Sequence, residues 1–178
     1  MDAHRNRMSR EQLFRDVIKE HSRRISRICS YFFTDTDDCK DAYQESLIRI
    51  WDNLPSFKGR SLLSTWIYRV AVNTCLAHIR SDKRRNGLIV NGCNPENWQL
   101  AESPAEEDAG TEKKAKFLQQ FMKGLNIADR TLVSLYLEEQ PTREISAITG
   151  LSEANVRVRL HRIKERIKNE WEEMQYGT

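Results

Sequence analysis

The chain of 178 residues lacks the features that direct a protein into a membrane or out of the cell. No apolar run approaches the length of a transmembrane helix. The opening residues, MDAHR, have none of the apolar core of a signal peptide. We therefore expect a cytoplasmic protein without membrane insertion.

Cysteine is scarce, and no CxxC pair is present. The four cysteines are Cys29, Cys39, Cys75 and Cys93. Scattered cysteines of this kind are typical of reduced thiols in the cytosol. His21 or His78 would complete a zinc ligand set only by a coincidence of folding, so we expect no metal.

Motifs of catalysis and cofactor binding are also missing. The sequence has no GxGxxG, no P-loop and no HExxH. Its carboxylates fall on predicted helix faces or in a polar tether, not around convergent bases. We therefore expect neither an active site nor a cofactor, and an enzyme is the least favoured class.

Charge is unevenly distributed, although the net charge is only +3. Residues 87–111 contain five carboxylates and no lysine or arginine, together with several Asn-Gly, Asn-Pro and Pro turn signals. We interpret residues 86–111 as an acidic, flexible linker. It would join two small helical domains, residues 9–85 and 112–176, in an all-α protein.

Residues 142–168 read as a short helix, a tight turn and a longer basic helix. Pro141 cannot continue a preceding helix, and Thr142 is a candidate N-cap for the short one. Gly150 supplies the turn, Ser152 a fresh N-cap, and the second helix begins at Glu153. This pattern is typical of a helix-turn-helix unit that binds DNA, although basic amphipathic helices are often ordinary surface helices.

The second helix carries one apolar stripe and several basic faces. The stripe recurs at spacings of four, three and four, in Val156, Leu160, Ile163 and Ile167. The cations lie outside it, which suits a helix in the major groove that makes base and phosphate contacts.

The residue pattern of the first domain predicts three helices. Apolar residues keep a helical period over residues 11–33, an acidic turn at 34–38 offers N-caps, and Pro55 ends the second helix. The third helix buries a stripe from Leu63 to Thr74. On another sector it carries Trp66, Arg69, Asn73 and Arg80, a mixture of aromatic, amide and cationic groups suited to unstacked single-stranded bases. The alternative is that Trp66 folds into the core and the polar groups are solvated.

Two blocks carry a resemblance to a known family. The first comprises DAYQESL at 41–47, Trp51, FKG at 57–59 and TWIYRVAVN at 65–73. The second comprises EISAITGLS at 144–152 and NVRVRLHR at 155–162. In this order and spacing they resemble the two conserved domains of the extracytoplasmic-function (ECF) sigma factors, over nearly the whole chain apart from the linker.

The resemblance implies a non-catalytic specificity subunit that directs RNA polymerase core to promoters and assists their melting. It also assigns a helix face to the clamp of the polymerase's largest subunit. A face of carboxylates and an amide around an indole can engage a partner helix. That face consists of Asp41, Gln44, Glu45, Ile48 and Trp51, although Trp51 is also a candidate core residue.

By the same resemblance, the loop at 58–63 and the neighbouring helix face read the minus-ten element. There a base leaves the stack and is held by the protein. The residues are Lys58, Ser61, Leu62, Leu63, Trp66, Arg69, Asn73 and Arg80. The family often has an acidic or small residue followed by Ser-Phe in this loop, where this chain has RSLL at 60–63. We infer the same mechanism with an altered base preference.

The resemblance assigns the minus-thirty-five element to the recognition helix. The residues are Glu153, Asn155, Arg157, Val158, Arg159, His161 and Arg162. Guanidinium groups suit the acceptors of guanine, so Arg157 and Arg162 are expected at guanine or phosphate, Val158 at a thymine methyl or the backbone, and Arg159 at phosphate.

Two further expectations come from the resemblance. The linker would thread into the RNA exit path of the polymerase, where its carboxylates could face basic walls; the alternative is a solvated tether. An anti-sigma protein is expected to hold the chain inactive. The main rival from another class is a helix-turn-helix regulator with an N-terminal sensing or dimerisation domain, which would have no reason to carry the block at 43–73.

Overall fold

The computed structural model describes residues 2–33, 35–86 and 109–176, and within these ranges the regular structure is helical. The N-terminal half contains α1 (Asp2–Ser30), α2 (Thr36–Asn53), a short 3₁₀ helix (Leu54–Ser56) and α3 (Leu63–Asn86). The C-terminal half contains α4 (Ala109–Gly124), α5 (Ile127–Leu137), α6 (Thr142–Thr149) and α7 (Glu153–Tyr176). No helix in the described ranges is long and apolar enough to cross a membrane. The expected all-α class is confirmed. Most of the expected linker, 87–108, lies outside the described residues.

The N-terminal half is a three-helix unit in which α1, α2 and α3 each pack against the other two. Buried apolar side chains from all three helices meet in its core, among them Ile25, Ile50 and Ile67. Asp35 caps α2 as the acidic turn predicts, because its carboxylate accepts from the backbone N–H groups of Asp37 and Asp38.

Pro55 has a structural consequence beyond ending α2. It lacks the N–H that would bind the carbonyl four residues earlier, which belongs to Trp51. The Arg10 guanidinium donates to that carbonyl instead, and it also lies over the Trp51 ring, 4.1 Å from the ring centroid. The end of α2 is thereby tied to α1. The first helix begins at Asp2, earlier than the predicted residue 11, because the apolar period starts only near Phe14 and gives no earlier signal.

The C-terminal half holds the helix-turn-helix. Gly150 ends α6 in the left-handed region, with φ 76°, and its N–H donates to the Ser146 carbonyl at 2.8 Å. The Ser152 hydroxyl accepts from the N–H of Asn155 at 3.3 Å and caps α7, which begins at Glu153 as predicted. The N-cap of α6 is Pro141, not Thr142, and Thr142 is the first helical residue. The prediction of a Thr142 cap was therefore wrong, because proline's fixed φ already sets the entry into the helix.

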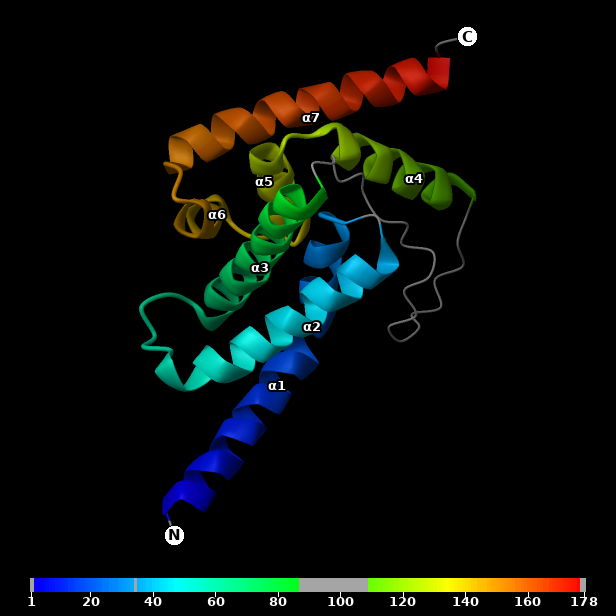
Figure 1. The fold of residues 1–178 in the computed structure, drawn as a ribbon. Coiled ribbons are helices and arrows are strands. Elements are labelled where there is room, and N and C mark those ends of the chain that lie inside the picture. Colours follow the sequence, from blue (N-terminus) through cyan, green and yellow to red (C-terminus); the bar gives the residue numbers. More distant parts are fainter. Residues whose placement is uncertain (1, 34, 87–108, 177–178) are drawn as a thin grey trace.

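The two halves pack against each other. Helix α3 lies between α2 on one side and α6 on the other, while α7 crosses the end of the molecule opposite to the N-terminus (Figure 1). Arg130 of α5 contributes to this packing from a buried position. It donates to the carbonyls of Lys123 and Leu125 at the end of α4, at 2.9 and 3.2 Å, and to that of Phe32 after α1, at 3.4 Å. An arginine placed at the ends of two helices satisfies carbonyls that have no partner within the helix.

Candidate nucleic-acid interface

Helix α7, the predicted recognition helix, presents an exposed surface beside its buried stripe. Val156, Leu160 and Ile163 are buried as the stripe predicts, and Ile167 packs against the same core. Most of the predicted minus-thirty-five residues point to solvent: Glu153, Asn155, Arg157, Val158, His161 and Arg162. Val158 is 50% exposed, a large fraction for an isolated aliphatic side chain. Such a face can offer guanidinium donors and an apolar contact to a groove.

Arg159 is separated from this set. Its Nε and Nη2 donate to one carboxylate oxygen of Asp129, at 2.9 and 2.6 Å, and the side chain is only 28% exposed. Asp129 is also near the N-cap Asn126, whose amide donates to the second carboxylate oxygen at 2.7 Å. The structure therefore turns Arg159 toward α5, where it joins two helices, and a phosphate contact would have to replace this ion pair.

The predicted minus-ten residues occupy the loop before α3 and one side of that helix. In the loop, Lys58 is exposed, Leu62 is 61% exposed, and Ser61 and Leu63 are half-buried. Gly59 has φ 65°, a conformation that favours glycine and turns the loop.

On the helix itself, Trp66 is half-buried against Phe57, with ring centroids 5.5 Å apart. The indole thus supports the loop while part of it remains accessible. Asn73 and Arg80 are exposed, about two and four turns further along the helix.

Arg69 lies in the same row but contacts the other half of the protein. Its Nη2 donates to the carbonyl of Ala147 in α6 at 2.7 Å. Further along α3, Asn73 and Arg80 line a cavity of about 420 Å³ whose opposite wall includes Ile148, Thr149 and Leu151. The predicted minus-ten residues on α3 are thus partly covered by α6 and the turn that follows it.

The predicted polymerase face lies on α2. Asp41, Gln44 and Ile48 are exposed, Ile48 at 55%, and Glu45 is half-buried with its carboxylate accepting from Arg49 at 2.7 Å. Trp51 is half-buried and meets Phe14 edge to face, with centroids 5.1 Å apart. It therefore packs between α1 and α2 at the border of the exposed face.

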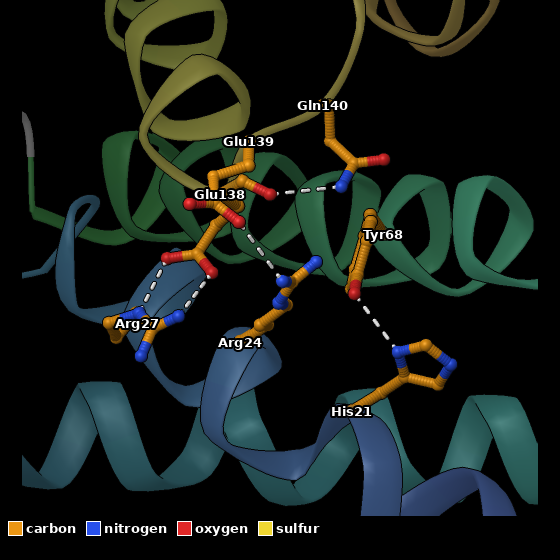
Figure 2. Close-up of polar contacts among 7 residues, drawn as sticks. All are labelled: His21, Arg24, Arg27, Tyr68, Glu138, Glu139 and Gln140. Carbon is orange, nitrogen blue, oxygen red and sulfur yellow. Dashed lines mark hydrogen bonds and ion pairs between the residues drawn. The ribbon is translucent and has the colours of Figure 1, made fainter.

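Sequence reasoning missed a polar cluster that joins the two halves (Figure 2). Arg27 of α1 donates through Nε and Nη2 to the two carboxylate oxygens of Glu138, both at 2.7 Å, and the Glu138 side chain is fully buried. Arg24 pairs with Glu139 at 3.3 Å. Nearby, His21 and Tyr68 share a hydrogen bond of 2.9 Å between Nδ1 and the phenol oxygen. No sequence signal couples residues 27 and 138, because their proximity exists only in the fold.

Two pKa values in this cluster are shifted by burial and by the contact with Glu138. The hydrogen bond to that carboxylate raises the pKa of Arg27, although burial opposes the effect. Burial, assisted by the same carboxylate, raises the pKa of Tyr31 to about 12. The two short contacts between the Arg27 guanidinium and the Glu138 carboxylate have the geometry of an ion pair.

The described cysteines belong to the core. Cys29, Cys39 and Cys75 are free and buried, and the Cys75 thiol lies 3.8 Å from the Cys29 sulfur. Burial raises the pKa of Cys75, which keeps it a thiol. Within the described ranges, no three histidine, cysteine or acidic side chains gather as a metal site. Cys93 lies outside these residues.

A helix-turn-helix whose second helix exposes arginines beside a buried stripe is typical of DNA-binding proteins. Comparison with known proteins identifies its kind. Residues 17–85 match the model of sigma-70 region 2, and residues 118–167 match that of sigma-70 region 4.

Relatives extend over most of the chain. The ECF RNA polymerase sigma factor SigW of Bacillus subtilis is 26% identical over 167 residues, covering 90% of this chain and 89% of the relative. The ECF sigma-E factor of Salmonella typhimurium is 27% identical over 175 residues, covering 89% and 86%. The sigma factor RpoE of Bartonella quintana, solved with the anti-sigma factor NepR, has the same fold, with a TM-score of 0.68, 17% identity and coverage of 88% of this chain and 94% of that one.

The chain belongs to the sigma-70 family and, within it, to the ECF sigma factors. Its role is therefore that of a promoter-specific transcription initiation factor, which works with RNA polymerase core and promoter DNA. The alternative of a regulator with an N-terminal sensing domain loses its basis, because sigma-70 region 2 occupies that part of the chain.

Proposed function

We propose that the chain binds a promoter through two separate faces while α2 binds the polymerase. In this division, residues 9–85 form the domain that binds the polymerase and the minus-ten element. Residues 112–176 form the domain that binds the minus-thirty-five element, and residues 86–111 are the linker between the two domains. The match of residues 17–85 and 118–167 to regions 2 and 4 supports the division.

The exposed face of α7 is the proposed reader of the minus-thirty-five element. Arg157 and Arg162 lie outside the buried stripe, and their guanidinium groups fit the N7 and O6 acceptors of guanine in the major groove. The exposed Val158 between them suits a thymine methyl group. This combination of two accessible guanidinium groups and an aliphatic group on one helix face is the observation on which the proposal mainly rests.

The face of α3 is the proposed reader of the minus-ten element. Taking a base out of the stack costs a few kcal/mol, and an aromatic surface with nearby hydrogen-bonding groups recovers that energy. Trp66 offers a partly accessible indole, and Asn73 offers an exposed amide that can recognise a base edge. Lys58 and Arg80 are exposed cations at either end of the face and suit the phosphates. We infer that this face assists promoter melting.

The exposed part of α2 is the proposed contact with the clamp of the largest polymerase subunit. Asp41 and Gln44 offer polar partners, and the 55% exposed Ile48 offers an apolar contact between them and Trp51. An apolar centre with a polar rim is the usual anatomy of a specific protein interface. Because the polymerase would carry out the synthesis of RNA, we expect the chain itself to have no active site. We also expect it to act where the polymerase does, in the cytoplasm.

An anti-sigma factor is a further proposed partner. The similar RpoE of Bartonella quintana was solved in complex with the anti-sigma factor NepR. A fold shared at this level makes comparable regulation of this chain a reasonable proposal.

Reconstitution tests the proposal directly. The purified chain is mixed with core polymerase and genomic DNA from its source, and the transcripts are sequenced. We expect new start sites that share two upstream elements near minus-ten and minus-thirty-five, without any other specificity subunit. A failure of the chain to co-purify with core polymerase, or initiation that requires another sigma factor, contradicts the proposal.

A further inference from the structure

The cavity of about 420 Å³ between α3, α5 and the turn from α6 to α7 has mainly aliphatic walls. Six aliphatic side chains form them: Val72, Leu76, Ile79, Ile127, Ile148 and Leu151. Those of α3 recur at spacings of four and three, which puts them on one face of the helix. Aliphatic walls give water few hydrogen-bond partners, so an apolar ligand displaces water from such a space easily.

The cavity has the size and the opening of a small-molecule site. Ligand pockets in proteins usually measure roughly 300 to 1,000 Å³. A dry apolar cavity of about 150 Å³ holds benzene, so this cavity can hold a molecule roughly three times as large. Asn73, Arg80 and Ala128 line the cavity and are also exposed, so it opens to the surface along α3 and α5. A ligand can therefore enter without unfolding the chain.

The charged groups of the lining are cationic. In the described part of the chain, the residues around the cavity include Arg80 and Arg159 and no aspartate or glutamate. Arg159 is neutralised by Asp129, which accepts two hydrogen bonds from it. Thr131 and Thr149 donate their hydroxyl hydrogens to carbonyls of their own helices, at 2.8 Å each. The exposed Arg80 therefore supplies the main charge of the cavity, which is complementary to a carboxylate.

We propose that the cavity binds an aliphatic carboxylate, a medium-chain fatty acid, with its alkyl chain against the aliphatic walls and its carboxylate at Arg80. Arg80 follows Val72 by eight residues, about 12 Å along α3, so an alkyl chain can lie along this helix and end at the guanidinium. Among the described residues that line the cavity there is no aromatic ring to stack on a planar ligand, which favours an alkyl chain. The inference goes beyond the proposed function and does not depend on it.

Titration of the full chain with dodecanoate, below the concentration at which it forms micelles, tests the site by isothermal calorimetry. This probe has about fourteen heavy atoms and is within the size limit of the cavity. We expect saturable binding of one dodecanoate per chain. Dodecan-1-ol has the same chain length without the charge, and we expect it to bind about tenfold more weakly because it lacks the charge-assisted hydrogen bond to Arg80.

Methyl NMR of the wild-type chain locates the bound molecule. We expect dodecanoate to shift the methyl signals of Leu76, Ile127 and Ile148, which line the cavity. The signal of Leu13, which is 45% exposed on α1 and lies outside the cavity, should stay in place.

Two variants with matched controls test the carboxylate end and the space separately. Arg80→Gln removes the guanidinium, and its control Arg143→Gln removes an exposed guanidinium on α6 outside the lining. Ala128→Trp places an indole at the opening of the cavity, and its control Ala115→Trp makes the same change at an exposed position of α4. We expect each test variant to bind dodecanoate about tenfold more weakly and each control to bind as the wild type does. Circular dichroism verifies that each variant is folded.

Binding without saturation overturns the inference, as do methyl shifts at Leu13 as large as those at Ile148. Equal affinity for dodecanoate and dodecan-1-ol, or equal affinity of a folded test variant and its control, also overturns it. The calorimetry and NMR of the wild type decide the question even if a variant does not fold. Reconstitution with core polymerase involves no fatty acid and decides the proposed function separately.

Discussion

Arg159 of the recognition helix donates two hydrogen bonds to Asp129 of α5, while Arg162, three residues further on, points to solvent. The arginines of this basic helix therefore point in different directions. One side of α7 contains a guanidinium used for packing between helices, and another contains guanidinium groups exposed to solvent, which we propose contact DNA. This division predicts different consequences for two substitutions of the same kind.

For Arg162→Ala we expect a loss of about 1 to 3 kcal/mol in promoter binding if the side chain makes a bidentate base contact. Folding stability should change by less than about 0.5 kcal/mol, since the side chain is exposed. Titration of holoenzyme on promoter and random DNA measures the first effect. Equal losses on the two DNAs would exclude a base contact for Arg162.

For Arg159→Ala, in contrast, we expect a loss of about 1 kcal/mol of folding stability, because Asp129 is left half-buried without its guanidinium partner. Urea denaturation measures it, with Arg162→Ala as the control of equal chemistry. Unchanged stability would show that the ion pair contributes nothing to the fold.

Asn73→Ala should impair promoter melting without impairing duplex binding. Its side chain is exposed on α3, so its loss leaves the fold intact while removing an amide proposed to recognise a base of the minus-ten element. A lost hydrogen bond predicts a decrease of up to about tenfold in open complex, measured as permanganate reactivity of the melted thymines. Gln12→Ala on α1 is the matched control, since Gln12 is also exposed. A parallel loss in binding to fully duplex promoter would place Asn73 outside the melting step.

Ile48→Lys should weaken association with core polymerase. Ile48 is 55% exposed on α2, and a lysine there would bring a charge into the apolar centre of the proposed contact. We expect a decrease in affinity of at least about tenfold in a competition assay against a labelled sigma factor. Leu13→Lys makes the same chemical change on α1, where Leu13 is 45% exposed, and should have little effect. Equal effects of the two substitutions would argue against α2 as the contact.

Stability should fall when the pH drops below about 6.5. Burial lowers the pKa of His21, an effect that Arg24 reinforces and Glu20 opposes. The unfolded chain, with a histidine pKa of about 6.5, therefore binds more protons than the folded chain between the two pKa values. The contribution of His21 is complete above pH 6.5 and declines as the pH falls toward its folded pKa.

Urea denaturation of wild type and His21→Gln at pH 7.5 and 5.5 measures this contribution. Glutamine keeps a polar group next to the Tyr68 hydroxyl but does not titrate. We expect a smaller decrease in stability between the two pH values for the variant, since the carboxylates contribute equally to both proteins. An identical pH dependence of stability in the two proteins would show that His21 does not cause it.

The helix-turn-helix was predictable because its determinants are local. Gly150 ends a helix through its own conformational freedom, Ser152 caps the next helix from three residues away, and the buried stripe of α7 follows from helical periodicity. Two local details were missed. Pro141 occupies the N-cap position predicted for Thr142, and α1 begins before its apolar period does.

The candidate residues on α2, α3 and α7 could be named from the sequence, but their availability could not. Exposure depends on which other helices cover a face. Arg69 and Arg159 fall on the predicted faces and yet bind Ala147 and Asp129, because α6 and α5 happen to lie beside them. The roles proposed for the exposed residues stay predictions until the substitutions above are measured.

The sequence by itself determined the helices, the turn between α6 and α7, and membership of a family defined by two motif blocks, since each depends on residues a few positions apart. Only the tertiary structure decided that α6 rests on α3 and that Glu138 is buried against Arg27. Those contacts join residues 78 and 111 positions apart. Their energy comes from desolvation and charge pairing that arise only when the two halves meet, so no local pattern of residues can record them.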